Sequence, residues 1–337
     1  MTRKQLIIGA LLCLIASMSW GAMFPVAHHA LQKIDPFYFS FIRYIAVSAI
    51  LCVLLLIKEG KSAFRLEGKG KQLTFYGTMA FVVYNMCIFL GQKLMGDAGI
   101  IAASIFESLM PMITILLMWV TTRAVPPGYM LVSVVVALTG AVLVITKGSL
   151  SFFLTAGSHA LPLLLIFIAV VGWVIYSIGG GKFPGWSVLR YSTMTCLLGS
   201  AVSFVIVGTG SAFNIIAVPT WDVLVSVKYE MSFMILLPGL GALLSWNAGI
   251  KRLSPLNGIL FINFVPITTF AIMALEGYAI SIYEIIGTLL IIAALVGSNL
   301  FQRKLPSQPI SANVRISSAA SKDRRKGGKP AVGALRG

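Results

Sequence analysis

Charged residues are scarce in this 337-residue chain, where Asp, Glu, Lys and Arg together make up 11%. An average soluble domain carries about 25%. Acidic residues are the scarcest, with ten in the whole chain, while hydrophobic residues make up 58%. A chain with so few charges cannot give a soluble fold its polar surface, so a soluble globular protein is excluded.

Cysteines and the common catalytic patterns are equally sparse. The four cysteines lie singly in apolar stretches without CxxC or metal-ligand spacing, which favours ordinary packing roles. No HExxH, GxSxG or paired-carboxylate pattern occurs, and the GGGK stretch at 179–182 lacks the spacing of a phosphate-binding loop. The sequence therefore predicts no metal site, no cofactor and no enzymatic activity.

Ten apolar stretches are long enough to cross a bilayer as helices, which need about 20 residues each. They lack the alternation of barrel strands, so an all-α integral membrane protein with ten transmembrane helices is predicted. The expected spans are residues 6–30, 37–57, 73–95, 98–121, 127–146, 159–180, 186–208, 230–251, 255–275 and 279–302.

Lysines and arginines are distributed unevenly over the loops that ten spans create. Twenty of the 26 fall on the side that carries both chain ends and four on the other side, while Arg43 and Arg190 lie inside spans. Because cytoplasmic loops carry the positive excess, both termini are expected in the cytoplasm, with the protein in the inner or plasma membrane. This bias accounts for most of the net charge of +16, so no nucleic-acid partner is expected.

The last stretch, residues 306–337, is rich in Ser, Gly, Ala and basic residues and has almost nothing to bury. This composition is typical of disorder. A disordered basic cytoplasmic tail is therefore predicted, which either rests on anionic lipid head groups or stays in solvent.

The remaining parts, 1–150 and 151–305, repeat the same landmarks in equivalent spans. Since each part has five spans, an odd number, the second must insert upside down relative to the first. This predicts two inverted five-helix repeats around a central cavity, as in secondary transporters. The landmarks are MSWG at Trp20, Pro36, FIRY at Arg43 and VYNM at Tyr84-Asn85 in the first part, and VGWV at Trp173, Pro184, VLRY at Arg190 and LSWN at Trp246-Asn247 in the second.

The stretch SWGAMFPVAHHAL, followed by DPFYFSFIRY, resembles the opening signature of EamA-type members of the drug/metabolite transporter superfamily. The resemblance covers about residues 6–304 and implies a ten-helix exporter with a cavity walled mainly by helices one, three, four, six, eight and nine. VYNMCIFL, FESLMP and SWNAGI are similar to the aromatic amino-acid exporter branch. That branch implies an aromatic or acidic residue just before Pro111, where this chain has Glu107, Ser108 and Met110.

Glu107 is the single carboxylate well inside a predicted span, one helical turn before Pro111. A carboxylate in such a place is paired with a cation, protonated, or hydrated in a cavity. Three roles are therefore open: binding of substrate or a proton, pairing with Arg43 or Lys93, and burial as a neutral acid.

Aromatic and amide side chains in the middle of spans are further candidates for the cavity wall. An amide there needs a partner, either another helix or a ligand, and the aromatics lie too deep for the interfacial belt. Packing between helices is the alternative for each of them. The candidates are Trp20, Tyr84, Asn85, Trp173, Tyr176, Trp246, Asn247 and Asn263.

Arg43 and Arg190 lie off-centre, at matching depths of the second and seventh spans. A buried arginine must find carboxylates or carbonyl oxygens. The symmetric depths favour gate or scaffold roles, with bonds to backbone carbonyls, over direct contact with substrate. Pro111 and Pro266 lie in mid-span and predict helix kinks.

These features predict a secondary transporter, a monomer or weak homodimer in the lipid bilayer, that exports small metabolites such as amino acids or related compounds. A channel-like uniporter and a membrane-embedded enzyme without a recognisable motif are the alternatives. Mid-helix prolines and an inverted repeat favour alternating access. A cavity with aromatics, amides and one acid suits zwitterions, cations and apolar amines alike.

Overall fold

The computed structural model describes residues 3–123, 125–149, 156–253 and 259–304, and every regular element among them is a helix. The chain forms two units, residues 1–298 and 299–337. The second contributes only the end of the last helix to the described residues, and the predicted tail, 306–337, lies outside them. The prediction of an all-helical membrane protein is confirmed for the described part of the chain.

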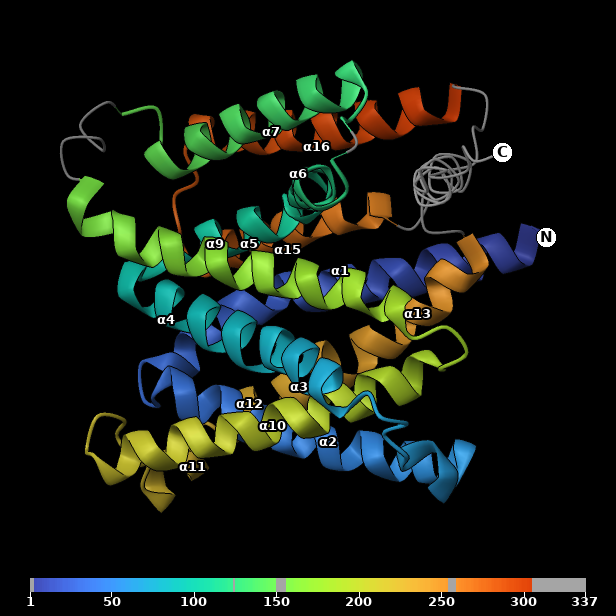
Figure 1. The fold of residues 1–337 in the computed structure, drawn as a ribbon. Coiled ribbons are helices and arrows are strands. Elements are labelled where there is room, and N and C mark those ends of the chain that lie inside the picture. Colours follow the sequence, from blue (N-terminus) through green and yellow to red (C-terminus); the bar gives the residue numbers. More distant parts are fainter. Residues whose placement is uncertain (1–2, 124, 150–155, 254–258, 305–337) are drawn as a thin grey trace, which may run out of the picture. The chain divides into compact units, whose positions relative to one another are not determined.

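Seven helices or helical runs in the described residues are long and apolar enough to cross a membrane. The bent pair α5 (Asp97–Ser108) and α6 (Met110–Thr122) makes an eighth if it is counted as one span. The seven are α1 (Arg3–Leu31), α2 (Pro36–Glu59), the run of α3 (Gly70–Thr78), η2 (Met79–Tyr84) and α4 (Asn85–Met95), α7 (Gly128–Thr146), α9 (Ala156–Gly179), α10 (Val188–Ala212), and the run of α12 (Lys228–Met234), η4 (Ile235–Gly241) and α13 (Ala242–Leu253) (Figure 1).

Shorter elements occupy the last two predicted spans and the loops. The apolar helices α15 and α16 are shorter than a full crossing within the residues tested for it, which end at Ser298 for α16. The shorter elements are η5 (Ile259–Asn263), α15 (Phe264–Leu275), α16 (Ile282–Lys304), η1 (Lys61–Phe64), η3 (Gly180–Lys182) and α11 (Trp221–Ser226).

Capping side chains set where α2 and α10 begin. Asp35 Oδ1 accepts a hydrogen bond from the Phe37 N–H at 2.8 Å, and a proline takes the first helical position of α2, where no N–H is needed. Ser187 Oγ accepts from the Arg190 N–H at 2.9 Å. These caps place Arg43 two turns into α2 but Arg190 in the first turn of α10.

Glycines allow two pairs of helices to approach closely. A Cβ on Gly140 of α7 would lie 2.5 Å from the backbone oxygen of Gly287 in α16, and Figure 1 shows these two helices side by side. A Cβ on Gly77 of α3 would lie 2.2 Å from the backbone oxygen of Thr195 in α10. In lipid, where apolar burial gains little, such close backbone packing holds helices together.

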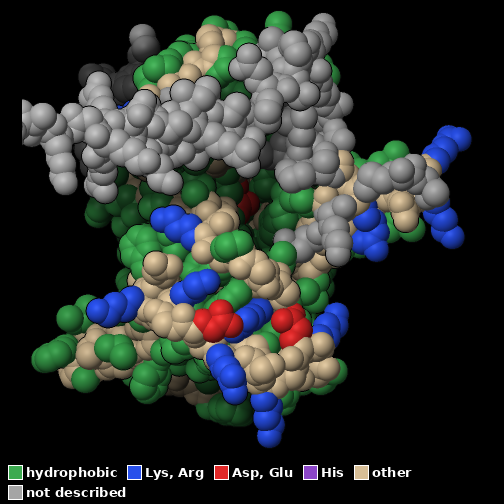
Figure 2. All heavy atoms as spheres, turned by 45° about the vertical axis from the view of Figure 1, so that its right-hand side comes forward, with side chains coloured by type: hydrophobic (Ala, Val, Ile, Leu, Met, Phe, Trp, Pro, Cys, Tyr) green, Lys and Arg blue, Asp and Glu red, His purple; other side chains and the backbone are tan. Residues whose placement is uncertain are grey.

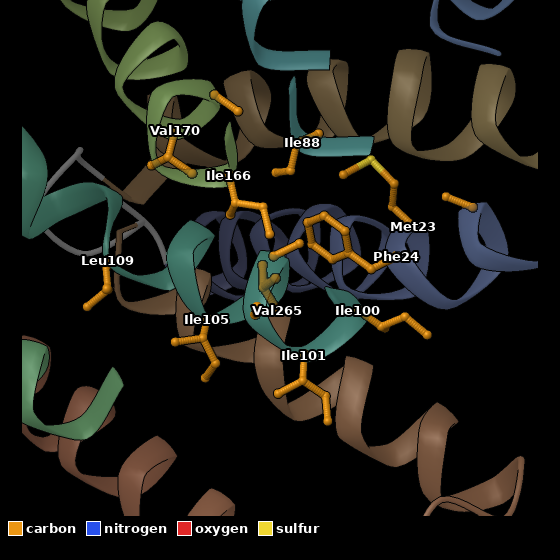
Figure 3. Packing of buried hydrophobic residues seen from close by; sticks show 14 of the residues in the cluster. Met23, Phe24, Ile88, Ile100, Ile101, Ile105, Leu109, Ile166, Val170 and Val265 are labelled. Carbon is orange, nitrogen blue, oxygen red and sulfur yellow. The ribbon is translucent and has the colours of Figure 1, made fainter. Parts of the chain in front are cut away.

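The largest buried cluster joins helices from both parts of the chain. Phe24 of α1, Ile88 of α4 and Ile100 of α5 share it with Ile166 of α9 and Val265 of α15 (Figure 3). The first three helices belong to residues 1–150 and the other two to residues 151–305. Helices of the two parts therefore bury their apolar faces against each other.

Contacts between loops define two ends of the helices. At the first, called the Arg190 end, Arg190 Nη2 donates to Glu67 Oε1 at 2.7 Å and Trp186 Nε1 donates to Glu67 Oε2 at 3.0 Å. These bonds join the loop 60–69 to the loop 183–187. Figure 2 brings this end forward and shows lysine and arginine side chains gathered there, with acidic side chains among them.

At the opposite end, called the Glu284 end, ion pairs join other helix termini. Lys147 Nζ, just after α7, lies 3.8 Å from Glu284 Oε1 at the start of α16. His29 Nε2, near the end of α1, lies 3.1 Å from Glu276 Oε1, just after α15. Contacts between side chains at or just beyond the helix ends thus link these helix termini to one another.

Candidate functional site

A cavity of about 50 Å³, called here the central cavity, lies between helices of both parts of the chain. Two charged side chains line it, Arg43 from α2 and Glu107 from α5. All other lining side chains are apolar or aromatic, among them Trp20 of α1, Tyr84 of η2 and Pro238 of η4. Among the sequence-predicted residues, the structure therefore brings one cation, one carboxylate and several rings together.

A larger space of about 470 Å³, called the vestibule, continues from the central cavity. Trp20, Trp173 and Tyr176 line both spaces. The vestibule extends to Phe183 and Trp186, in the loop that Arg190 ties to the loop 60–69. Aromatic walls thus lead from the Arg190 end to the two buried charges.

Glu107 is 5% exposed, and its Oε1 accepts a short hydrogen bond from the Tyr84 hydroxyl. Its Oε2 has no hydrogen-bond partner among the described residues. The two cations considered from the sequence do not pair with it: Arg43 makes other contacts, and Lys93 Nζ donates to the Ile34 oxygen at 3.3 Å. One carboxylate oxygen is therefore buried without a hydrogen-bond partner in the described part of the chain.

The helix that carries Glu107 is broken directly after it. α5 ends at Ser108, and α6 continues from Met110 at an angle of 53°. Pro111 follows the break as the second residue of α6, where its missing N–H costs no helix bond. Pro266 lies in the first turn of α15, after the 3-10 turn η5, and not in the middle of a helix.

Ring contacts connect most of the aromatic candidates. Tyr84 lies 5.0 Å from Trp173, and Trp173 lies 5.3 Å from Tyr176, between ring centroids. Trp20 and Trp246 form a second pair at 5.3 Å. The first group lines the central cavity, while Trp246 lines the vestibule.

The amide candidates do not line these spaces where they are described. Asn85 is fully buried, and its Nδ2 donates to the Ala80 oxygen at 2.7 Å within the same helical run. Asn263 is buried at the end of η5 and is not among the lining residues. The side chain of Asn247 lies outside the described residues.

Arg43 is 1% exposed and binds across the two parts of the chain. Its Nε donates to the Met234 oxygen of α12 at 3.1 Å, and its Nη1 lies 3.4 Å from the Met23 sulfur. The guanidinium carbon sits 4.9 Å from the Tyr44 ring centroid. Met234 directly precedes the π-helical segment η4, in which a carbonyl pairs with the N–H five residues on, so Arg43 adds a second donor to this oxygen.

Arg190 has different surroundings from Arg43, although the sequence places both at matching depths. Its Nε donates to the Ala63 oxygen and its Nη2 to the Arg65 oxygen, each at 2.7 Å. The guanidinium also binds Glu67 and stacks 3.8 Å from the Trp186 ring centroid. Hydrogen bonds from Trp186 and Arg190 hold the pKa of Glu67 below its ordinary value.

Two π-helical segments beside the central cavity were not predicted from the sequence. η2 ends at Tyr84, and η4 contains Pro238, so both contribute lining residues. They lie in the third and eighth predicted spans, which are equivalent in the two parts. Pro238 between glycine-rich neighbours was a usable signal for η4, whereas MAFVVY in η2 has none. Such segments occur frequently at functional sites.

Comparisons with known proteins agree with this geometry. Residues 7–146 match the EamA-like transporter family. A Bacillus subtilis (strain 168) protein described as "Uncharacterized transporter YrdR" is 54% identical over 304 residues, 90% of this chain and 95% of the relative. "Uncharacterized transporter YyaM" of the same organism is 25% identical over 281 residues, 83% and 90% of the two chains. A crystal structure is similar in fold, with a TM-score of 0.64 and 19% identity, over 88% of this chain and 99% of the other.

Proposed function

Because this chain belongs to the EamA-like transporter family of the drug/metabolite transporter superfamily, we propose that it is a secondary transporter that exports small metabolites, amino acids or related compounds. The observation that carries the proposal is the buried Glu107, which has one oxygen without a partner in an aromatic cavity among the described residues. A buried carboxylate oxygen without a hydrogen-bond partner destabilises the folded protein. A bound ligand that supplies the partner offsets this cost.

The cavity walls favour a substrate with an amino group. A carboxylate attracts an ammonium group directly, and the faces of Tyr84, Trp173 and Tyr176 add cation–π attraction around it. The vestibule supplies room for the rest of a metabolite against Trp20 and Trp246. Amino acids and apolar amines of moderate size fit this combination of one acid and several rings.

Alternating access through two inverted five-helix repeats, residues 1–150 and 151–305, is the proposed mechanism. Paired π segments in equivalent spans and a cavity walled by both parts support it. The vestibule leads to the Arg190 end, while ion pairs such as Lys147–Glu284 bridge the opposite end. With the basic Arg190 end in the cytoplasm, this arrangement corresponds to an inward-facing state ready to load substrate for export.

The orientation and the remaining chain follow from the same proposal. Both termini face the cytoplasm, the protein resides in the plasma or inner membrane as a monomer or weak homodimer, and residues 306–337 form a disordered tail. The basic bias of the sequence supports this orientation.

Flux measurements in proteoliposomes test the function. The purified protein is reconstituted, loaded with unlabelled L-phenylalanine or L-leucine, and assayed for uptake of the labelled compound. A carrier gives saturable uptake that an opposing gradient of substrate stimulates. Non-saturating flux without such stimulation would indicate a channel and refute alternating access.

A further inference from the structure

The cation in the central cavity has no acidic partner. Arg43 is almost completely buried, and no carboxylate among the described residues lies within ion-pair distance of it. An arginine stays charged in proteins, and a buried charge is stable only when other groups compensate it. Groups other than a described carboxylate must therefore compensate the charge of Arg43.

Two of the three guanidinium nitrogens of Arg43 have protein contacts. Nε donates to the Met234 carbonyl, and Nη1 meets the thioether of Met23, which is a weak acceptor. In the described part of the chain, Nη2 has no acceptor. Because Arg43 lines the central cavity, this nitrogen is available to a bound group.

The start of η4 determines how Arg43 is held. The arginine Nε donates to the carbonyl of Met234, just before this segment, at 3.1 Å. Gly239 in η4 permits the approach, since a Cβ there would lie 2.8 Å from Val47 and 3.8 Å from Arg43 Nε. The arginine is thus anchored by one nitrogen and leaves another unused.

Arg190 shows how this chain satisfies an arginine that serves only to tie loops together. Its Nε and Nη2 bind the carbonyls of Ala63 and Arg65, and Nη2 also binds the carboxylate of Glu67. Arg43 is more deeply buried and yet has one carbonyl and no carboxylate. A purely structural role would require more hydrogen-bond acceptors for the more deeply buried arginine, whereas Arg43 has fewer than Arg190.

We propose that Arg43 binds the acid group of the substrate while Glu107 binds its amino group. The inference rests on the proposed transport function, because it concerns the same cavity. Arg43 and Glu107 line one small space, and in the described part of the chain Nη2 of the first has no acceptor and Oε2 of the second has no donor. A zwitterion satisfies both, and its apolar remainder extends along Trp173 and Tyr176 into the vestibule.

Three ligands that share one apolar tail separate the two charges. L-phenylalanine carries both groups, phenethylamine lacks the acid, and 3-phenylpropanoate lacks the amine. Binding is measured by thermal shift and calorimetry on the purified full-length protein, and the L-leucine series (L-leucine, 3-methylbutylamine, 4-methylpentanoate) is run in parallel. The zwitterion of at least one series should bind about ten-fold or more tightly than either of its analogues, since each charged pair contributes a factor of that order.

Variants of Arg43 assign the acid-binding role. In Arg43→Gln, the zwitterion should lose its advantage over the amine, while the amine binds as in the wild type. Arg43→Lys keeps the charge and should retain part of the preference. Arg252→Gln, whose arginine bonds within its own helix, should leave the ratio unchanged.

Two results overturn the inference, and they differ from failure of the proposed function. Wild-type protein that binds the amine as tightly as the zwitterion rules out recognition of the acid group. Equal weakening of both ligands in Arg43→Gln assigns Arg43 to structure alone. If none of the ligands of either series binds, the proposed substrate class itself fails, and the acid-binding role fails with it.

Discussion

At the scale of single residues, Glu107 combines deep burial with an oxygen that no described group satisfies. Glu107→Gln keeps an acceptor for Tyr84 but removes the charge. Arg43 lines the same cavity, but no described cation forms a direct ion pair with Glu107, so the change breaks no such pair, and the melting temperature should stay within about 3 °C of the wild type. Flux of amine-bearing substrates should fall about ten-fold or more.

Melting temperature and proteoliposome flux of Glu107→Gln are measured on the same preparation. Glu230→Gln, at a partly exposed position of α12, is the matched control and should change neither. A large drop in melting temperature with normal flux would show that Glu107 neutralises a neighbour and binds no substrate.

Glu67 gives a prediction for pH dependence at the Arg190 end. Its pKa lies below the ordinary value of 4.5 because Trp186 and Arg190 donate hydrogen bonds to the carboxylate. A lowered folded-state pKa contributes stability at pH values above the unfolded pKa, and that stability is lost as the pH falls through the folded pKa. Glu67→Gln should therefore melt below the wild type at pH 7, with the difference shrinking below about pH 4.5.

Thermal melts of wild type and Glu67→Gln between pH 7 and pH 3.5 check this expectation. The difference should also decrease at high salt, because the carboxylate is exposed and its ion pair is screened. A difference that stays constant across the whole pH range would show that the ionised carboxylate contributes nothing to the loop contact.

At the scale of elements, the close contact of α7 with α16 depends on small residues. A Cβ at Gly140 would lie 2.5 Å from the Gly287 oxygen, so Gly140→Ala forces the two backbones apart. We expect a loss of about 1–3 kcal/mol, typical of overpacking, read as a lower melting temperature in detergent. Gly208→Ala in α10 is the control, since a Cβ there meets nothing within 4 Å. Equal effects of the two substitutions would contradict a specific contact.

The sequence predicts elements and residue chemistry better than it predicts partners. Long apolar runs locate the helices because lipid requires them, and rarity alone identifies Arg43 and Glu107. The partner of Arg43 is a carbonyl 191 residues away in sequence, and no local pattern encodes that contact. Asn85 donates a hydrogen bond to Ala80 inside a π-helical segment, and the residues MAFVVY of that segment carry no signal from which it could be predicted.

At the scale of the whole molecule, the proposed orientation is open to a direct test. Ser62, in the loop at the Arg190 end, and Gln32, just after α1, are both exposed. In a background without the four native cysteines, an impermeant thiol reagent should label Ser62→Cys only from the cytoplasmic side and Gln32→Cys only from outside. Labelling from the reverse sides would invert the topology, and labelling of both from one side would contradict the order of the spans.

The close approach of Gly239 in η4 to α2 has a consequence for how such proteins diverge. A Cβ at position 239 would lie 2.8 Å from the Val47 side chain. A lineage that replaces this glycine must make the residue at 47 smaller or move the two helices apart. Positions 47 and 239 should therefore change together across relatives, although they stand in opposite halves of the gene.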